Sequence, residues 1–272
     1  MEQQYLTLLN KCLTTPPRET RNSITHSVFG ERLVHDFKDG FPLLTTKKMF
    51  LKGIVEELAW FLRGSTDVNE LRAKGVHIWD INSADRNYDA GPVYGFQWRH
   101  FGAEYTDCKA DYTGKGVDQI ASIIDQIKTD PTSRRILLSA WNPLAQKDMC
   151  LPPCHVSYQF YVNNGKLSCQ MYQRSADIFL GLPFNVASTA LLMMLIAHET
   201  GLEPDKLIMC LGDVHLYSQH VEVAKSQLVR EPRAFPSLTI KRDKDGLKHL
   251  EMKDLILKNY TYYPRLKAPM MK

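Results

Sequence analysis

Apolar residues recur at three- or four-residue spacing in five stretches of the chain, as they do along one face of a helix. Helices are therefore predicted at residues 2–13, 48–63, 117–128, 185–199 and 220–229. Gly64 supplies a stop signal for the second helix, and Pro131 follows the third. Residues 185–199 are apolar on almost every side, which predicts a helix buried inside the molecule.

Strand signals lie in four other stretches, at residues 134–141, 155–162, 167–174 and 207–217. The second and third flank Asn164-Gly165, a pair that readily adopts the positive φ angles of a tight two-residue turn, so we expect a β-hairpin. Helices and strands are mixed without strict alternation, which favours an α+β fold. We expect a single domain over residues 1–272, with a large mixed β-sheet covered by helices.

Composition places the chain among ordinary globular proteins. Its 272 residues are 44% hydrophobic, which is enough for a sizeable core. No run of about 18 apolar residues is present, which argues against a membrane span. The first residues carry an acid, Glu2, and lack the basic-then-apolar order of a secretory signal. We therefore expect a cytoplasmic location.

The cysteine spacing argues against one kind of site, whereas the net charge leaves two interpretations open. The six cysteines are dispersed, with no CxxC pair and no tight Cys/His cluster, which disfavours a metal site and indicates reduced thiols. The net charge of +4 fits an anionic substrate or a nucleic acid, but ordinary surface lysines would give the same value. Composition alone does not choose between these.

Cys154 is the first candidate for chemistry. It stands at the start of the predicted strand 155–162, directly after two prolines. The neighbouring His155 invites comparison with a thiol protease, but consecutive strand residues point to opposite faces, so the imidazole cannot easily reach the sulfur. Taken alone, Cys154 would more often be a buried structural thiol.

The predicted hairpin changes this expectation. A two-residue turn at Asn164-Gly165 makes Cys154 face Ser175, with Arg174 one step away, and a β-bulge would shift this pairing by one residue. A neighbouring guanidinium increases the ionised fraction of a thiol. A nucleophile, a cation and a hydroxyl at one strand end predict a reactive site.

Six motifs extend over nearly the whole chain. The longest is LPPCHVSYQFYVNNGKLSCQMYQRSADIFLGLPFNVAS at residues 151–188. The others are DGFPLLTTKK (39–48), EELAWFLRGST (56–66), GPVYGFQWRHFGAEY (91–105), SRRILLSAWNP (133–143) and LGDVHLYSQH (211–220). In content and order they closely resemble the thymidylate synthase family. Motifs of this length are highly specific.

The resemblance implies a fold, a reaction and partners. It implies an α+β homodimer packed through its sheets, which methylates dUMP at C5 to give dTMP. The one-carbon and hydride donor would be 5,10-methylenetetrahydrofolate, and no metal would be needed. Because C5 of uracil is only weakly nucleophilic, the family first adds a cysteine thiolate to C6.

The family's catalytic positions are matched by Cys154, Glu57, Tyr94, Asp177 and Arg174. Cys154 would be the nucleophile, Glu57 a proton relay and Tyr94 an aid to proton removal near the reacting carbon. On a helical wheel, Glu57 lies on the shoulder of an apolar stripe, while Glu56 points away. Partial desolvation there would raise the pKa of Glu57 towards the range useful for acid–base catalysis.

Five residues match the family's phosphate-binding groups. Arg21, Arg174 and Ser175 would act within one subunit, and Arg134 and Arg135 would come from the partner subunit. Arginine suits a phosphate because its planar fork makes two charge-assisted hydrogen bonds at once. The expected homodimer would thus complete the substrate site.

Asn185 begins the predicted helix 185–199, where it is either a helix cap or, by the resemblance, the residue that selects the base. Its amide can donate to O4 of uracil and accept from N3–H, and cytosine reverses both groups, so Asn favours uracil. Asp213, His215 and Tyr217 alternate along a strand and share one face. His215 and Tyr217 match contacts to the sugar hydroxyl.

Positions that line the family's folate site are matched by Trp79, Asp177, Leu180, Gly181 and Phe184. Leu151 matches a residue that screens the intermediate from water. The chain departs from the family pattern around Arg21, where a loop is one residue shorter, and after Trp79, where a segment is short. It also ends in Lys272, where the family has a small apolar residue whose carboxylate helps close the site.

Three other functions are weighed at this point. A deoxyuridylate hydroxymethylase would share the scaffold but quench the intermediate with water, and Trp79 and Leu151 favour methylation instead. A nucleic-acid-binding protein would use the basic balance, but no basic cluster interleaved with aromatic residues is present. A catalytically inactive relative is disfavoured because every expected reactive position is occupied.

Overall fold

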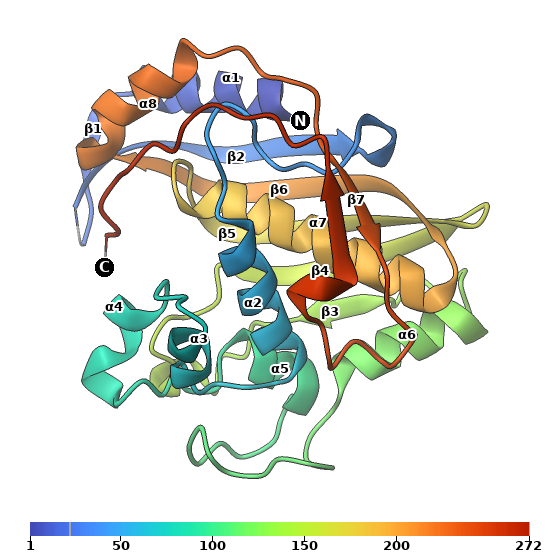
Figure 1. Ribbon diagram of the computed structural model, residues 1–272. Coiled ribbons are helices and arrows are strands. Elements are labelled where there is room, and N and C mark those ends of the chain that lie inside the picture. The colour runs from blue at the N-terminus through green and yellow to red at the C-terminus, as the bar shows by residue number, and fades with distance from the viewer. Residues whose placement is uncertain (22, 272) are drawn as a thin grey trace.

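The computed structural model describes residues 1–21 and 23–271 (Figure 1). Lys272, the unusual chain end, lies outside the described residues. The central sheet has six strands in the order β1-β2-β6-β5-β4-β3. Its strands are β1 (Pro17–Glu19), β2 (Ile24–Asp36), β3 (Leu137–Ser139), β4 (His155–Asn163), β5 (Lys166–Asp177) and β6 (Glu203–Tyr217).

The sheet is mixed. β5 and β6 are parallel, and the other neighbouring strands are antiparallel. A parallel pair needs a long crossover connection, which α7 (Gly181–Thr200) supplies. A separate two-stranded sheet is formed by β7 (Ser237–Ile240) and β8 (Leu255–Lys258). The α+β fold with a mixed sheet is as predicted.

All five predicted helices are present. The helices besides α7 are α1 (Glu2–Leu13), α2 (Leu51–Leu62), α3 (Asn69–Ala73), α4 (Asp80–Ser83), α5 (Tyr94–His100), α6 (Gln119–Thr129) and α8 (Val221–Leu228). The predicted strand 134–141 forms only at Leu137–Ser139. The long strand β2 was not predicted, because charged residues and Gly30 interrupt its alternation and few of its residues are buried.

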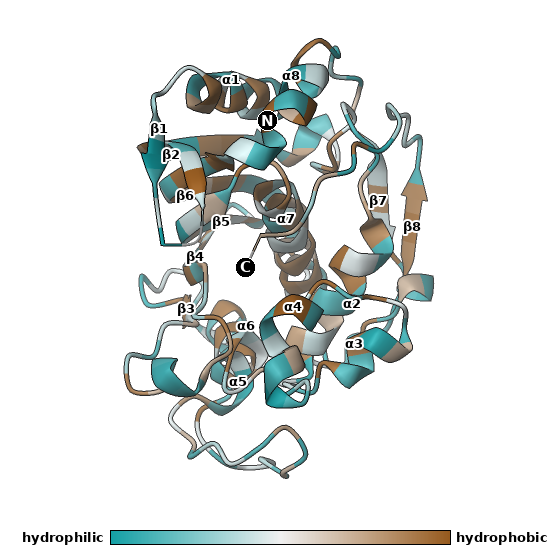
Figure 2. Cartoon of the chain, turned by 90° about the vertical axis from the view of Figure 1, so that its left-hand side faces the viewer, coloured by the Kyte–Doolittle hydropathy of each residue, from teal (hydrophilic) through white to brown (hydrophobic). Residues whose placement is uncertain are grey.

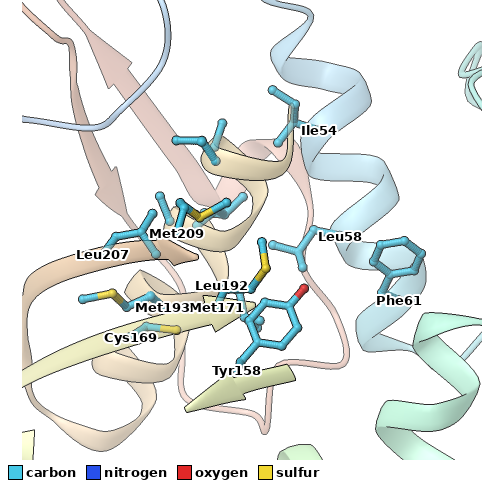
Figure 3. Close-up of a cluster of buried hydrophobic side chains, with 14 of the residues drawn as sticks. Ile54, Leu58, Phe61, Tyr158, Cys169, Met171, Leu192, Met193, Leu207 and Met209 are labelled. Carbon is cyan, nitrogen blue, oxygen red and sulfur yellow. The ribbon is translucent and has the colours of Figure 1, made fainter. Parts of the chain in front are cut away.

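The helix α7 lies at the centre of the core. In Figure 3, its Leu192 and Met193 belong to one cluster with Met171 of β5, Met209 of β6 and Leu58 of α2, and all five are at most 1% exposed. By length and composition alone α7 could cross a membrane, but 72% of its apolar window is buried inside the molecule. Its apolar surface is that of a core helix, as its sequence predicted.

The hairpin between β4 and β5 forms at the predicted turn. Asn164 and Gly165 have φ angles of 50° and 72°, and Asn163 pairs with Lys166. The predicted register continues along β4 as far as Ser157. The turn residues therefore set which residues of the two strands meet.

A β-bulge then shifts the register at the other end of the hairpin, between His155 and Ser157. Cys154 consequently lies opposite Arg174, whose backbone N–H donates to the Cys154 carbonyl at 2.9 Å. The expected pairing of Cys154 with Ser175 was wrong by one residue, because the bulge adds an unpaired residue to β4. The bulge brings the cysteine and the arginine together.

Candidate active site

A cavity of about 540 Å³ lies where β5 and β6 end, facing residues of α2, α5 and the first turns of α7. In Figure 2 these strand ends, α4 and the start of α7 surround the end of the chain. The predicted site residues that line the cavity are Arg21, Glu57, Trp79, Tyr94, Leu151, Cys154, Arg174, Ser175, Asp177, Gly181, Asn185, His215 and Tyr217. Segments far apart in the sequence thus converge on one space.

Cys154 precedes β4 and is held by its backbone. Its N–H donates to the hydroxyl of Tyr94 at 2.6 Å, and its carbonyl accepts from Arg174. The Arg174 guanidinium in turn donates to the carbonyls of Pro152 and Pro153, at 2.8 and 2.9 Å. The two prolines therefore present acceptors that keep the guanidinium beside the cysteine.

Burial dominates the protonation of Cys154. It raises the pKa of the Cys154 thiol, and the Asp177 carboxylate acts in the same direction. Arg174 and the Tyr94 hydroxyl lower this pKa but do not cancel the effect of burial. The expected effect of Arg174 on the Cys154 pKa is present, but burial outweighs it.

His155 is not arranged as a base for the thiol. Its Nδ1 lies 3.0 Å from the Tyr158 hydroxyl. Burial lowers the pKa of His155 to about 4, despite the opposing effect of Asn185. A buried imidazole that stays neutral and is bonded elsewhere agrees with the argument against a thiol-protease pair.

Glu57 combines burial with a single hydrogen bond. Burial raises the pKa of Glu57 to about 7, and the indole N–H of Trp79, which donates to Oε1 at 2.8 Å, opposes the shift. Neighbouring Glu56 does not line the cavity, and it is buried in a pair with Lys74. The predicted rise in the Glu57 pKa is confirmed, and such a carboxyl can give or take a proton near neutral pH.

Asn185 lies in the second turn of α7, because the helix begins at Gly181. The helix-cap alternative is therefore wrong: Pro183 fits in the first turn, where its missing N–H is not needed, so the helix starts before it. The Oδ1 of Asn185 accepts from Nε2 of Gln173 at 2.8 Å, and Gln173 also donates to the Ser175 carbonyl at 3.0 Å. These bonds hold the Asn185 amide in one orientation in the cavity wall.

Asp213, His215 and Tyr217 all line the cavity, as strand alternation predicted. Nδ1 of His215 lies 3.1 Å from Oδ1 of Asp213, and this hydrogen bond lowers the pKa of the Asp213 carboxyl. Because a carboxylate only accepts, Nδ1 of His215 donates, and Nε2 of the neutral ring is then an acceptor.

Comparison with known proteins shows which family this chain belongs to. Residues 3–272 match the family model described as thymidylate synthase. The chain belongs to the thymidylate synthase family. It is 51% identical to a thymidylate synthase of Herpesvirus ateles and 49% identical to one of Homo sapiens, over 99% of this chain and 97% and 90% of those proteins. It is also 47% identical to a bifunctional dihydrofolate reductase-thymidylate synthase of Leishmania major, over 99% of this chain and 55% of that protein.

Four positions expected from the thymidylate synthase family do not line the cavity. Leu180 and Phe184, at the start of α7, are half-buried and pack against the core. Arg134 and Arg135 are exposed on the segment before β3. A single subunit therefore does not bring these two arginines to the site.

The cavity is also lined by residues that the sequence analysis did not select. Strand alternation places Gln173 on the same face as Ser175 and would have found it. Met270 and Met271 reach the cavity from the end of the chain, and no local pattern signals a contact of that kind. The remaining ones are Thr20, Thr25, Phe61, Ile78, Asn82 and His155.

Proposed function

We infer that this protein converts dUMP to dTMP, with 5,10-methylenetetrahydrofolate supplying both the methylene group and a hydride. The observation that carries this proposal is one cavity that holds a cysteine, a carboxyl with a pKa of about 7 and an oriented amide. Membership of the family and identities of 51 and 49% to proteins named thymidylate synthase support it.

The chemistry would begin at Cys154. Its thiolate adds to C6 of the uracil ring, which gives C5 the character of an enolate carbon, and C5 attacks the methylene carbon of the folate. Loss of the C5 proton and departure of the folate nitrogen leave an exocyclic methylene on the ring. A hydride from the folate converts this group to methyl, the ring expels the sulfur, and dihydrofolate leaves.

Glu57 and Tyr94 are suited to the proton transfers. Glu57 has a pKa of about 7, so it can relay protons near neutral pH. Burial raises the pKa of Tyr94 well above its usual range, so the phenol stays neutral. Its hydroxyl lies 2.6 Å from the backbone nitrogen of Cys154, the residue whose sulfur would bind C6.

The other cavity residues would hold the two substrates. On the nucleotide, Arg21, Arg174 and Ser175 would bind the phosphate and Asn185 the base. The Nε2 acceptor of His215, together with Tyr217, would bind the sugar hydroxyl. Trp79, Asp177 and Gly181 would bind the folate, and Leu151 would screen the intermediate from water. Leu180 and Phe184, which the resemblance also assigns to the folate, pack against the core instead of lining the cavity.

The products of the reaction test this function directly. The protein is mixed with dUMP and 5,10-methylenetetrahydrofolate, and both products are identified by mass. We expect dTMP and dihydrofolate. A 5-hydroxymethyl nucleotide with tetrahydrofolate would instead identify a deoxyuridylate hydroxymethylase, and an unmodified nucleotide would reject both.

A homodimer packed through the sheets is part of the proposal. Three apolar side chains on one face of the sheet, Leu137, Tyr161 and Tyr172, are 48, 63 and 42% exposed. Alternation puts them opposite core residues of the same strands, namely Leu138, Phe160 and Met171. A second copy packed on this face would bury them and could carry Arg134 and Arg135 to its partner's cavity.

Mixing two inactive variants tests the shared site. Arg134→Ala/Arg135→Ala protein and Cys154→Ser protein should each be nearly inactive. After unfolding and refolding together, the mixture should recover about a quarter of wild-type activity, because half of randomly formed dimers are mixed and each contains one intact site. Sedimentation would verify that dimers have re-formed. Dimers without recovered activity would show that the arginines do not act across subunits.

A further inference from the structure

His220 is a buried polar residue behind the cavity, and none of the roles above uses it. It ends the 3₁₀ turn Ser218–His220 that follows β6, and it is 0% exposed. Its ring packs between the rings of Phe179 and Tyr217, at centroid distances of 5.6 and 5.5 Å. His220 therefore packs directly against Tyr217, which lines the cavity.

Only one of the two ring nitrogens of His220 is hydrogen-bonded among the described residues. Nε2 lies 2.8 Å from the carbonyl oxygen of Pro269, which can only accept, so Nε2 carries the hydrogen. Nδ1 has no hydrogen-bond partner among the described residues and lies 3.9 Å from Oδ1 of Asp177. That oxygen accepts from the N–H groups of Phe179 and Leu180, at 2.9 and 3.2 Å. His220 thus stands between a cavity-lining carboxylate and the C-terminal segment.

The C-terminal segment, residues 265–271, packs Leu266 and Ala268 against the core but makes few hydrogen bonds. Arg230 donates to the carbonyl of Pro264 at 2.9 Å. Beyond that point, within residues 1–21 and 23–271, the bond from His220 to Pro269 is the only hydrogen bond made by residues 265–271. Because residues 265–271 make a single hydrogen bond with the rest of the described chain, their position depends strongly on that bond.

The end of this segment forms part of the cavity. Met270 and Met271 line it, together with residues of β5, β6 and α7. We propose that His220 is a positioning residue, which by binding Pro269 holds Met270 and Met271 as the outer wall of the cavity on the side of Asp177. The identity of the ligand behind that wall, the reduced folate, rests on the proposed function.

Two substitutions of His220 separate this role from simple packing. In His220→Gln, the side chain can place an N–H donor where Nε2 was, whereas in His220→Asn it is one bond shorter and reaches only the place of Nδ1. We expect His220→Asn to raise KM for 5,10-methylenetetrahydrofolate by about 5- to 10-fold, the loss of about one neutral hydrogen bond. His220→Gln should keep the wild-type KM, and in His220→Asn the Kd for dUMP should change less than the folate KM, because only the packing of Tyr217 on this ring links His220 to the nucleotide side. An unchanged folate KM in His220→Asn would overturn the proposal.

Trypsin gives a readout that does not depend on catalysis. Arg265 and Lys267 are exposed, and cleavage after either one shortens the chain by a mass that is resolved on the intact protein. His220→Asn should be cleaved there several-fold faster than wild type, and His220→Gln at the wild-type rate. Equal rates in all three proteins would also overturn the proposal.

A chain that ends at Ala268 removes the acceptor without altering the core, in case His220→Asn does not fold. This shortened chain should bind dUMP normally. Its loss of folate affinity should be at least as large as that expected for His220→Asn, and adding His220→Gln to it should change nothing further. Wild-type folate affinity in this chain would overturn the positioning role. If the wild type makes no dTMP but tail cleavage follows the Asn and Gln pattern, the proposed function fails while the role of His220 stands.

Discussion

Cys154→Ser is expected to slow dTMP formation by on the order of 10⁴-fold or more, because a serine hydroxyl does not supply the anion that must add to C6. Binding of dUMP should change little. Serine has nearly the same shape, and the contacts with Tyr94 and Arg174 run through the backbone of this residue. Single-turnover kinetics measure the first effect, and equilibrium binding of dUMP measures the second.

A fluorinated uracil nucleotide supplies the control for this prediction. With folate present, it should form a covalent adduct with the wild-type protein and none with Cys154→Ser. Cys150→Ser is the matched variant, because Cys150 is also partly buried but does not line the cavity, so its adduct should persist. Near-normal methylation by Cys154→Ser would remove the covalent mechanism.

Asn185→Asp should lower kcat/KM for dUMP by about 10- to 100-fold, since a carboxylate still accepts from N3–H but cannot donate to O4, at a cost of about 1–3 kcal/mol. A carboxylate repels O4 of uracil, whereas it accepts from the amino group of cytosine. The same change should therefore raise kcat/KM for dCMP. Gln173 can still donate to a carboxylate oxygen, so the wall of the cavity should keep its shape.

The ratio of kcat/KM for dUMP and dCMP is the measurement that decides the role of Asn185. Asn185→Ala serves as the control, because it removes hydrogen bonds to either base and should lower activity without reversing the preference. An unchanged ratio in Asn185→Asp would refute the assignment of Asn185 to the base.

Much of the fold could be predicted because its signals are local. The turn at Asn164-Gly165 fixes the hairpin, and the apolar surface of residues 185–199 indicates a core helix, as α7 confirms. The strand β2 was missed because its stability comes from pairing with β6, so its own sequence does not alternate. Pairing with a neighbouring strand can thus stabilise a strand whose own sequence shows no alternation of hydrophobic residues.

The sequence predicted which residues form the site better than it predicted how they are arranged. Thirteen of the residues that line the cavity were named from the family resemblance, eleven of them within the six motifs. The bulge at His155 depends on how β4 meets its neighbours, so no sequence pattern indicates where it lies. The net effect on the Cys154 pKa depends on burial, which no motif encodes. Arg134 and Arg135 need a second subunit before any geometry can be assigned to them.

The unusual pKa of Glu57 also affects how tightly the protein is folded. In an unfolded chain a glutamate ionises near pH 4.3, whereas in the folded protein Glu57 ionises at about pH 7. Between these values the unfolded chain holds fewer protons, so the free energy of unfolding falls as pH rises through this window, and the contribution of Glu57 is lost above it. At neutral and higher pH the fold is therefore less stable than it would be with an ordinary glutamate, and in return Glu57 can exchange a proton near pH 7.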